Sequence, residues 1–590
     1  MMEEVFRPVH PGRVKFGLSM FQKRFELNRR YLMSLRSDNL LRNHYLEAGL
    51  WSNLGKPEDC HWGWESPTSL GRGEFVGNWL SAAARIYAAT GDAEIKAKAD
   101  WIVSELGRCQ AANGGEWVGS VPEKALGWKS RGLPLSVPYT LHKPLMGLYE
   151  MAAYTGNDQA LEILIRAAKW FDRWTGQFTP EQMDDVLDWE PGAMMELWAN
   201  LYSLTGRPEH LELMRRYARR RLFDPLLDGQ DVLSNQHANT TIPEVHGPAR
   251  AWEVTGEARW RRIVEAYWAS AVIDRGHFCT GGQTCGEMWI PPGRLSARLG
   301  HNNQEHCTVY NMMRLAEYLL RWTGDSAYAD YWERNLYNGM LAQQNPDTGM
   351  VAYFLPLRGG SVKKWGTPTE DFWCCHGTLV QAQTTYVFNI FFEDHEGLIV
   401  CQTIPSELTW EWRGVEVKVS LSIDKQIEAR GLPEGIAYQL RVDCMQPSDF
   451  ALKFRIPWWV SGEPIIEVEG ERQEVVEGSS RFVSLRRTWR HEAVRFVLPK
   501  RLKAEPLPGE SSMVAFMDGP VVLAGLCEEG RTLYGDPSCP EAMLIGDAAY
   551  DVWRWLPGYT TKDQPANFRL IPLYEVRDER YTVYFPIRKA

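Results

Sequence analysis

The pattern of apolar residues changes character near residue 390 of this 590-residue chain. Before that point, long segments such as HKPLMGLYEMAAYTG and MRLAEYLLRWTG carry the spacing of amphipathic helices. After it, short runs alternate apolar and polar residues, and VEVKVSLSI (415–423) places its apolar side chains on one face of a strand. LKFRIPWW (452–459) and VRFVLP (494–499) repeat that alternation. The pattern therefore predicts a helical part followed by a β-rich part.

A short motif ending in Thr-Gly recurs in the helical part, and each copy follows one amphipathic run and precedes another. Its glycines are Gly91, Gly156, Gly206, Gly256 and Gly324. We interpret each copy as a helix that ends at a left-handed glycine, turns tightly and restarts. Such hairpins can close into a ring or remain an open superhelix. The unequal spacing favours closure, because functional loops are the long connections at one end of a ring.

These patterns predict a multidomain α+β protein in which an (α/α)6 helical barrel is followed by antiparallel β-sandwich domains. The chain is longer than one hydrophobic core usually serves, which agrees with several domains. We expect an extended N-terminal segment over residues 1–14 that can pair with the C-terminal sheets. The barrel is expected over 15–388 and the jelly-roll-like β-sandwich part over 389–590, where DGPVVLAGL and YTVYFPI read as further strands.

Composition and charge exclude several classes of function. The chain has 75 acidic against 65 basic residues, a formal net charge of −10 and no Lys/Arg-rich stripe, which argues against nucleic acid as a partner. No stretch approaches the roughly 18–20 apolar residues of a membrane span. The first residues carry acids at Glu3 and Glu4 and no apolar core, so they do not read as a secretory signal. We therefore expect a cytoplasmic protein without a membrane partner.

The numbers of tryptophan and cysteine residues are unusually high and bear on function. The 26 Trp residues favour a carbohydrate ligand, because the indole offers a flat apolar face and one N–H donor for stacking on sugar rings. The 11 Cys residues are odd in number and irregularly spaced. In a reducing compartment this predicts core thiols, metal ligands or reactive groups rather than a disulfide framework.

The strongest local signal for chemistry is FWCCHGT (372–378), in which Cys374 and Cys375 are adjacent. Neighbouring side chains point in different directions in regular structure, so the chain must bend for both sulfurs to reach one metal. Upstream, Glu305 and Cys307 directly precede a helical run. Three thiols and one carboxylate form a credible tetrahedral Zn2+ set. Buried thiols without a metal are the alternative interpretation.

Other candidate residues lie in less specific surroundings. Glu287 follows a Gly-rich stretch, where burial can raise its pKa as a general acid requires, and a solvated loop acid is the alternative. His142 begins a helical run and is otherwise a capping or core histidine. His237 lies among hydrogen-bonding side chains in SNQHANTTIP. Glu196 begins another helix and can face the barrel lumen or solvent.

Together these motifs resemble the bacterial β-L-arabinofuranosidase family, glycoside hydrolase family 127 and its close relatives. The resemblance runs from FELNRRYLMSLRSDNLLRNHYLEAGL (25–50) through HANTTIP, E-x-C and FWCCHGT to RIPWW, DGPVVLAGL and IPLYEVRDERYTVYF. The chain departs from the family pattern at Glu74 and Asn78, where many relatives have histidines, and at Phe372, where some carry a further cysteine. These departures touch the expected pocket walls rather than the E-x-C and Cys-Cys set.

The resemblance implies a retaining exo-glycoside hydrolase that releases a terminal β-L-arabinofuranose, or a closely related sugar, from a small oligosaccharide or glycoside. It implies Zn2+ held by Glu305, Cys307, Cys374 and Cys375, with Cys374 as the nucleophile and Glu287 as the acid/base.

The resemblance also implies residues that bind the substrate. His142 and His237 match histidines that line the sugar pocket, Tyr353 in VAYFLPL matches a pocket tyrosine, and Glu196 is a further candidate. A homodimer is compatible with this family. Two rival interpretations remain open at this point: a polysaccharide lyase on a helical toroid, and a non-catalytic carbohydrate-binding protein with a structural zinc.

Overall fold

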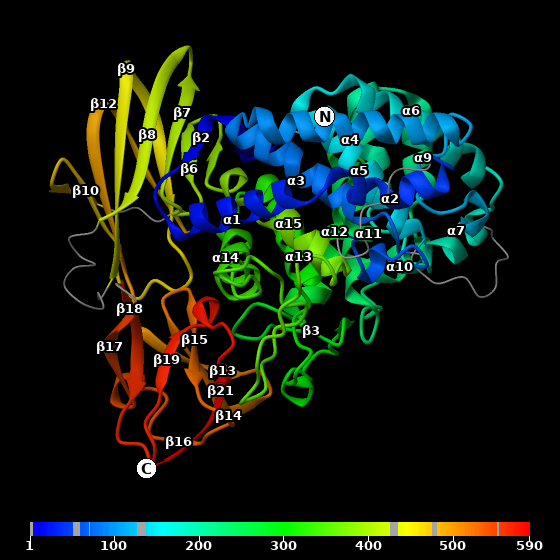
Figure 1. Ribbon diagram of the computed structural model, residues 1–590. Coiled ribbons are helices and arrows are strands. Elements are labelled where there is room, and N and C mark those ends of the chain that lie inside the picture. The colour runs from blue at the N-terminus through cyan, green and yellow to red at the C-terminus, as the bar shows by residue number, and fades with distance from the viewer. Residues whose placement is uncertain are drawn as a thin grey trace.

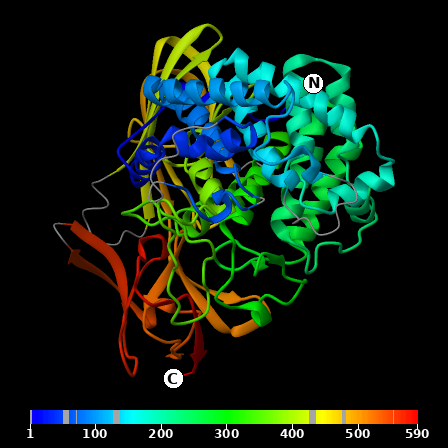
Figure 2. The same ribbon diagram turned by 45° about the vertical axis from the view of Figure 1, so that its right-hand side comes forward.

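The computed structural model describes residues 4–50, 60–69, 71–126, 137–424, 435–474, 481–551 and 554–589. Within them a helical part comes first and a β-rich part follows, which confirms the order predicted from the sequence. The two sheets lie one above the other at the left of Figure 1, and in Figure 2 the second sheet again lies below the first. No helix of the described residues is long and apolar enough to cross a membrane.

Six helices of the described chain pack side by side in a closed ring, each touching the next and the last touching the first. In order around the ring they are α3 (Phe75–Thr90), α5 (Val137–Thr155), α8 (Met194–Thr205), α11 (Ala238–Thr255), α13 (His306–Thr323) and α15 (Cys374–Ala382). Each of the first five is covered from outside by a following helix, in turn α4 (Ala93–Ala112), α6 (Asp158–Thr175), α9 (Pro208–Arg216), α12 (Ala258–Trp268) and α14 (Ser326–Asn335). This arrangement is the predicted (α/α)6 barrel.

The remaining helices lie outside the ring. They are α1 (Met20–Ser34), α2 (Ser37–Glu47), α7 (Pro180–Leu187) and α10 (Arg220–Leu227). Of these, α1 and α2 contact α3, and α10 contacts α12.

The Thr-Gly turns connect inner helices to outer ones. The five glycines have φ between 64° and 72° and follow the last residues of α3, α5, α8, α11 and α13, as predicted. Asp92 and Asp325 then accept hydrogen bonds from the first turn of the next helix. At the other end of the barrel the connections are longer, such as those that lead into α13 and α15. Short turns therefore close one end of the barrel, and long loops surround the other.

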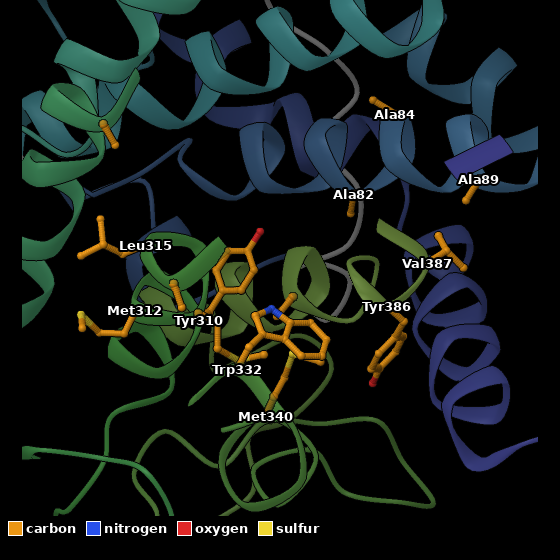
Figure 3. Packing of buried hydrophobic residues seen from close by; sticks show 14 of the residues in the cluster. Ala82, Ala84, Ala89, Tyr310, Met312, Leu315, Trp332, Met340, Tyr386 and Val387 are labelled. Atoms are coloured by element: carbon orange, nitrogen blue, oxygen red, sulfur yellow. The ribbon is translucent and has the colours of Figure 1, made fainter. Parts of the chain in front are cut away.

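Close packing of α3 on α5 depends on glycine. A Cβ added at Gly77 would lie 2.0 Å from the Lys143 carbonyl, and one added at Gly147 would lie 2.6 Å from the Gly77 carbonyl oxygen. The contact thus excludes any side chain at either position. Figure 3 shows small α3 side chains such as Ala82 together with larger residues of the same core, including Trp332.

The first sheet joins the N-terminal segment to strands that follow the barrel. The N-terminal strand β1 (Arg7–Pro8) pairs with β5 (Phe391–Glu393), and β2 (Val14–Phe16) pairs with β7 (Ser406–Trp412). Its longest strands, β9 (Gly435–Arg455) and β12 (Phe482–Pro499), pair antiparallel along their length. The sheet is completed by β6 (Gly397–Val400), β8 (Val415–Ile423), β10 (Ile465–Val468) and β11 (Glu471–Arg472). The domain boundaries expected from the sequence stay predictions.

The second sheet packs against the loops at the long-loop end of the barrel. Lys363 donates to the carbonyls of Leu573 and Val576, and Arg334 pairs with Glu505 at 3.0 Å. The Lys363 contacts anchor the connection into α15 on the C-terminal part, and the Arg334 contact joins that part to α14. The strands are β13 (Leu502–Leu507), β14 (Glu510–Asp518), β15 (Val521–Leu526), β16 (Leu533–Tyr534), β17 (Leu544–Asp551), β18 (Arg554–Thr561), β19 (Arg569–Pro572), β20 (Tyr581–Thr582) and β21 (Tyr584–Arg588).

Candidate functional site

A pocket of about 650 Å³ opens at the end of the barrel where the inner helices begin. Glu74 directly precedes α3, Tyr139 lies in the first turn of α5, His237 precedes α11, Glu305 precedes α13, and Cys374 is the first residue of α15. Helix N-termini carry partial positive charge and unpaired N–H groups. The position of the pocket therefore favours negatively charged groups.

All four predicted metal ligands come together at this pocket. Glu305, Cys307, Cys374 and Cys375 each offer one ligand atom, and these atoms all lie within 4.8 Å of one another. The Cys307 and Cys375 sulfurs are 3.3 Å apart, and Glu305 Oε1 lies 3.6 Å from Cys375 Sγ and 3.9 Å from Cys374 Sγ. The E-x-C segment at the start of α13 thus faces the Cys-Cys pair at the start of α15.

The environment of Glu305 tests whether this group fits a metal. Glu305 occupies the N-cap position of α13, yet its side chain makes no capping bond. Its Oε2 is buried and has no hydrogen-bond partner among the described residues. Burial raises the pKa of this carboxyl well above its usual value. A buried carboxylate oxygen without a partner beside three thiols is a donor set that fits Zn2+.

Cys374 differs from the other two thiols of the group. Cys307 and Cys375 are fully buried, whereas Cys374 is partly exposed to the pocket. Hydrogen bonds from the Cys307 and Cys375 thiols hold the pKa of Cys374 well below its usual value, although burial opposes this shift. The thiolate is the nucleophilic form of cysteine, so among the three thiols Cys374 is the candidate for a reactive sulfur.

A tight hairpin presents Glu287 to the same pocket. The strands β3 (Thr284–Cys285) and β4 (Met288–Trp289) are joined by Gly286 and Glu287, whose φ values are 57° and 67°. Two successive positive φ values are typical of a type I′ turn, and a Glu in this conformation is strained. Its carbonyl accepts a hydrogen bond from Ala238 N at 2.8 Å, which ties the hairpin to the start of α11.

One tyrosine contacts both predicted catalytic groups. The Tyr353 hydroxyl donates a hydrogen bond to Glu287 Oε1 and lies 3.2 Å from Cys374 Sγ. The carboxylate of Glu287 and the sulfur of Cys374 therefore face one small volume. This proximity was not derivable from sequence spacing, because the three residues lie on separate loops.

His237 lies between two carboxylates. Its Nε2 is 3.6 Å from Glu287 Oε2, and its Nδ1 is 3.0 Å from Glu190 Oε1. Burial opposes the charged ring, but the neighbouring carboxylates of Glu190 and Glu287 raise the pKa of His237 to about 10. In turn the His237 hydrogen bond lowers the pKa of Glu287, against the effect of burial. The expectation that burial raises the pKa of Glu287 is therefore wrong, because a charged partner outweighs desolvation.

Sequence reasoning did not find Glu190. Its backbone has φ 47°, and positive φ also occurs at Asn235, Glu287 and Gln304, all in or beside the site. Only eight non-glycine residues of the described chain share this conformation. Strained backbone concentrated at one place is typical of functional sites, but a sequence does not reveal it.

An aromatic stack holds the segment that carries the Cys-Cys pair. The Phe372 ring stacks on His61 at 4.3 Å and on His376 at 4.8 Å between ring centroids. The Tyr31 hydroxyl oxygen lies 2.6 Å from His376 Nε2. Phe372, the residue that departs from the family pattern, thus packs behind the pair rather than adding a fourth thiol.

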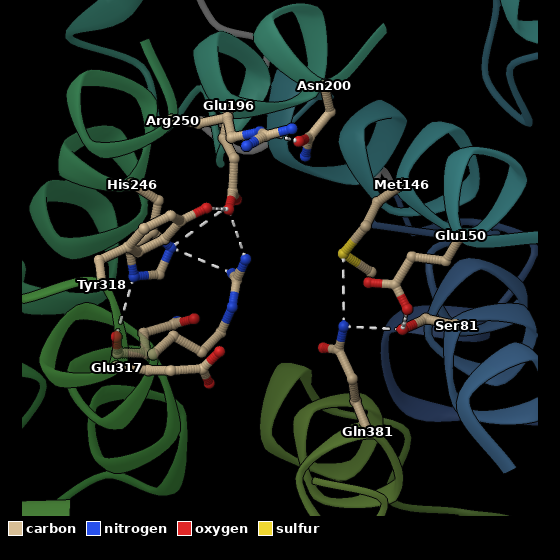
Figure 4. Close-up of polar contacts among 12 residues, drawn as sticks. Ser81, Met146, Glu150, Glu196, Asn200, His246, Arg250, Glu317, Tyr318 and Gln381 are labelled. Carbon is tan, nitrogen blue, oxygen red and sulfur yellow. Dashed lines mark hydrogen bonds and ion pairs between the residues drawn. The ribbon is translucent and has the colours of Figure 1, made fainter. Parts of the chain in front are cut away.

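Two of the predicted substrate-binding residues, His142 and Glu196, are not among the residues that line the pocket. His142 is buried behind Gly192, and burial lowers its pKa well below the usual value. Glu196 lies in a second cavity of about 260 Å³ at the other end of the lumen. There Glu196 Oε1 accepts hydrogen bonds from Arg314 at 2.6 Å and from Tyr318 at 2.7 Å (Figure 4).

Comparison with known proteins identifies a family. The model of the β-L-arabinofuranosidase GH127 catalytic domain matches residues 13–387, and that of the GH127 middle domain matches residues 397–500. A search of curated proteins returned no match.

Two solved structures share the fold over the full length of the chain. The GH127 β-L-arabinofuranosidase Ara127N-Se from Geobacillus stearothermophilus T6 is 17% identical with a TM-score of 0.75, covering 98% of this chain and 100% of its own. The GH127 β-arabinofuranosidase BT3674 is 18% identical with a TM-score of 0.77, covering 99% and 98%.

Proposed function

The chain belongs to the GH127 β-L-arabinofuranosidase family of glycoside hydrolases, and we propose that it removes a terminal β-L-arabinofuranose, or a closely related sugar, with retention of configuration. Its substrate is a small oligosaccharide or glycoside. Membership of a hydrolase family sets aside both the polysaccharide lyase and the non-catalytic binding protein.

The observation that carries the mechanism is the contact of Tyr353 with both Glu287 and Cys374. A retaining glycosidase requires a nucleophile and a proton donor on opposite sides of one glycosidic bond, a few ångströms apart. Cys374 Sγ offers the first and Glu287 the second. Tyr353 fixes their separation and donates to Glu287 Oε1 rather than to solvent.

Zn2+ would be held by Glu305, Cys307, Cys374 and Cys375, and when bound it keeps the thiols deprotonated at neutral pH. The start of α15 adds the partial positive charge of a helix N-terminus beside the Cys374 sulfur.

In the first step the Cys374 thiolate attacks the anomeric carbon, the bond from that carbon to the leaving oxygen breaks, and Glu287 donates a proton to this oxygen. The product is a thioglycosyl enzyme with inverted configuration. In the second step Glu287 takes a proton from a water molecule whose oxygen attacks the anomeric carbon. The bond to sulfur breaks, Cys374 leaves as the thiolate, and the configuration is restored.

His237 supplies the proton that Glu287 delivers. The imidazolium lies between Glu190 and Glu287, so the His237–Glu287 pair keeps one proton well above neutral pH. As negative charge builds on the leaving oxygen, the proton passes from His237 Nε2 to Glu287 Oε2 and from Glu287 to the substrate. The low pKa of Glu287 then suits its second role, in which it begins as the base.

The test compares wild type with Cys374→Ser and with Cys539→Ser, a matched change of an exposed thiol outside the pocket. Release of the chromophore from an aryl β-L-arabinofuranoside is expected to disappear in Cys374→Ser and to persist in Cys539→Ser. Metal analysis of the wild type is expected to give about one zinc per chain. Full turnover by Cys374→Ser would exclude the mechanism.

A further inference from the structure

Two exposed tryptophans form a corner at the mouth of the catalytic pocket. The Trp64 and Trp373 residues are 43% and 38% exposed, and both line the pocket. Their ring centroids are 5.4 Å apart and their planes meet at 86°. Large aromatic faces left open to solvent beside an active site offer area for a ligand ring.

The corner is held in place before any ligand arrives. Trp64 N donates to the Phe372 carbonyl at 3.1 Å, which joins the two tryptophan-bearing segments through their backbones. The Trp373 indole N–H donates to Asp371 Oδ1 at 3.3 Å. Gly71 lies against the Trp64 ring, where an added Cβ would meet the side chain at 3.1 Å. A ligand therefore meets fixed rings and loses little binding energy to ordering them.

The corner lines the same pocket as Glu287 and Cys374. Trp373 is adjacent in sequence to Cys374, and the pocket of about 650 Å³ falls in the range that holds drug-sized ligands, which exceeds a single pentose. The described pocket-lining residues nearest to Trp64 in the sequence carry hydroxyls or no side chain and no charge; they are Gly63, Ser66, Thr68, Ser69 and Gly71.

We infer that Trp64 and Trp373 form a subsite for the leaving group, and that the leaving group is a neutral sugar whose ring stacks on an indole face. This inference rests on the proposed function and adds the substrate class that the function leaves open. A sugar combines an apolar face with hydroxyls at its edge, which matches an aromatic plane flanked by Ser and Thr hydroxyls. An acidic sugar would find no cation among these residues.

The experiment compares kcat/KM for a β-L-arabinofuranosyl disaccharide with that for methyl β-L-arabinofuranoside, which has no ring to stack. In Trp64→Ala the ratio of the two constants is expected to fall about tenfold. Trp64→Phe is expected to keep most of the wild-type ratio. Trp101→Ala is the matched control, because Trp101 on α4 is 42% exposed and lies outside the pocket. An unchanged ratio in Trp64→Ala would overturn the inference.

A binding measurement separates failure of the subsite from failure of the proposed function. If the wild type hydrolyses neither glycoside, the proposed function fails, and saturation-transfer NMR with L-arabinose and D-galactose still tests the corner. Transfer to either sugar in the wild type and in Trp101→Ala, lost in Trp64→Ala, supports the subsite. No transfer in the wild type, or equal transfer in Trp64→Ala, contradicts it.

Discussion

Acidic side chains line cavities at both ends of the barrel lumen, but among the described residues they are paired with arginines at only one of them. In the cavity of about 260 Å³ each lining carboxylate has an arginine; for example, Glu150 pairs with Arg85 at 2.7 Å and Glu196 with Arg314 at 2.6 Å. Figure 4 shows Glu150 linked through Ser81 to Gln381, and a separate cluster around Glu196. The cavity is thus lined by groups that satisfy one another.

The N-terminal end carries an excess of acidic groups instead. Glu74, Glu190, Glu287 and Glu305 line the pocket together with Cys374, and His237 is the one cationic side chain among the described lining residues. Helix N-termini favour negative charge. Within the described chain, the comparison shows acids without arginine partners gathered where the inner helices begin, whereas the acids of the second cavity are paired with arginines.

The largest expected effect on activity follows from replacing Glu287, the proposed general acid. Glu287→Gln removes the proton donor while keeping the shape, and kcat/KM for an alkyl glycoside is expected to fall by about 10²–10⁴-fold. Aryl glycosides with good leaving groups are expected to lose less in the first step, because they need little protonation. Equal losses for both leaving groups would contradict the assignment of Glu287 as the acid.

In the cavity that contains Glu196, a substitution is expected to reduce the stability of the fold. Glu196→Gln leaves Arg314 without its charged partner in a mostly buried site, which is expected to lower the free energy of unfolding by about 3 kcal/mol. Denaturant unfolding measures this change. Zinc content and KM are expected to match the wild type, since Glu196 lies outside the catalytic pocket. A raised KM with unchanged stability would restore Glu196 as a substrate-binding residue.

The pH dependence follows from the proton that His237 and Glu287 share. The pKa of His237 is raised to about 10, so the wild-type pair loses this proton, and kcat/KM falls, only as the pH rises towards 10. In His237→Gln the proton resides on Glu287 alone, and the alkaline limb is expected to move to lower pH by about two units or more. His210→Gln, at a buried histidine of α9, is the control. An alkaline limb that stays in place would exclude His237 as the proton source.

The smallest expected effect concerns recognition of the sugar. Glu74 is buried in the pocket wall, and burial raises the pKa of its carboxyl well above the usual value, against the opposing charge of Lys143. It is placed to accept a bond from a substrate hydroxyl, so Glu74→Ala is expected to lower kcat/KM about tenfold through KM. A substrate that lacks the contacted hydroxyl should be insensitive to the change. Equal sensitivity of all deoxy substrates would contradict this role.

Much of the fold was predictable because its signals are local. The change from helical to alternating periodicity marks the order of the two parts, and each Thr-Gly turn needs a residue with positive φ that glycine supplies. The family resemblance drawn from the E-x-C and Cys-Cys motifs is confirmed by the matched family models.

Features set by contacts between distant segments were not predictable. The sequence left open whether Glu196 faces the lumen or solvent, and it does not show which of the two cavities its side chain enters. The pKa of Glu287 depends on His237, which the fold brings beside it, so burial alone gave the wrong direction. Glu190 and the corner formed by Trp64 and Trp373 likewise depend on loop conformation.

The central claim is that Cys374 becomes covalently bound to the sugar during turnover. Glu287→Gln treated with an activated aryl β-L-arabinofuranoside should accumulate the intermediate, because its second step lacks the base. Intact mass spectrometry with peptide mapping is predicted to find one pentosyl group on the peptide that contains Cys374, and no such group when Cys374→Ser is added. A pentosyl group on another residue, or substrate turnover with inverted product and no adduct, would contradict the account.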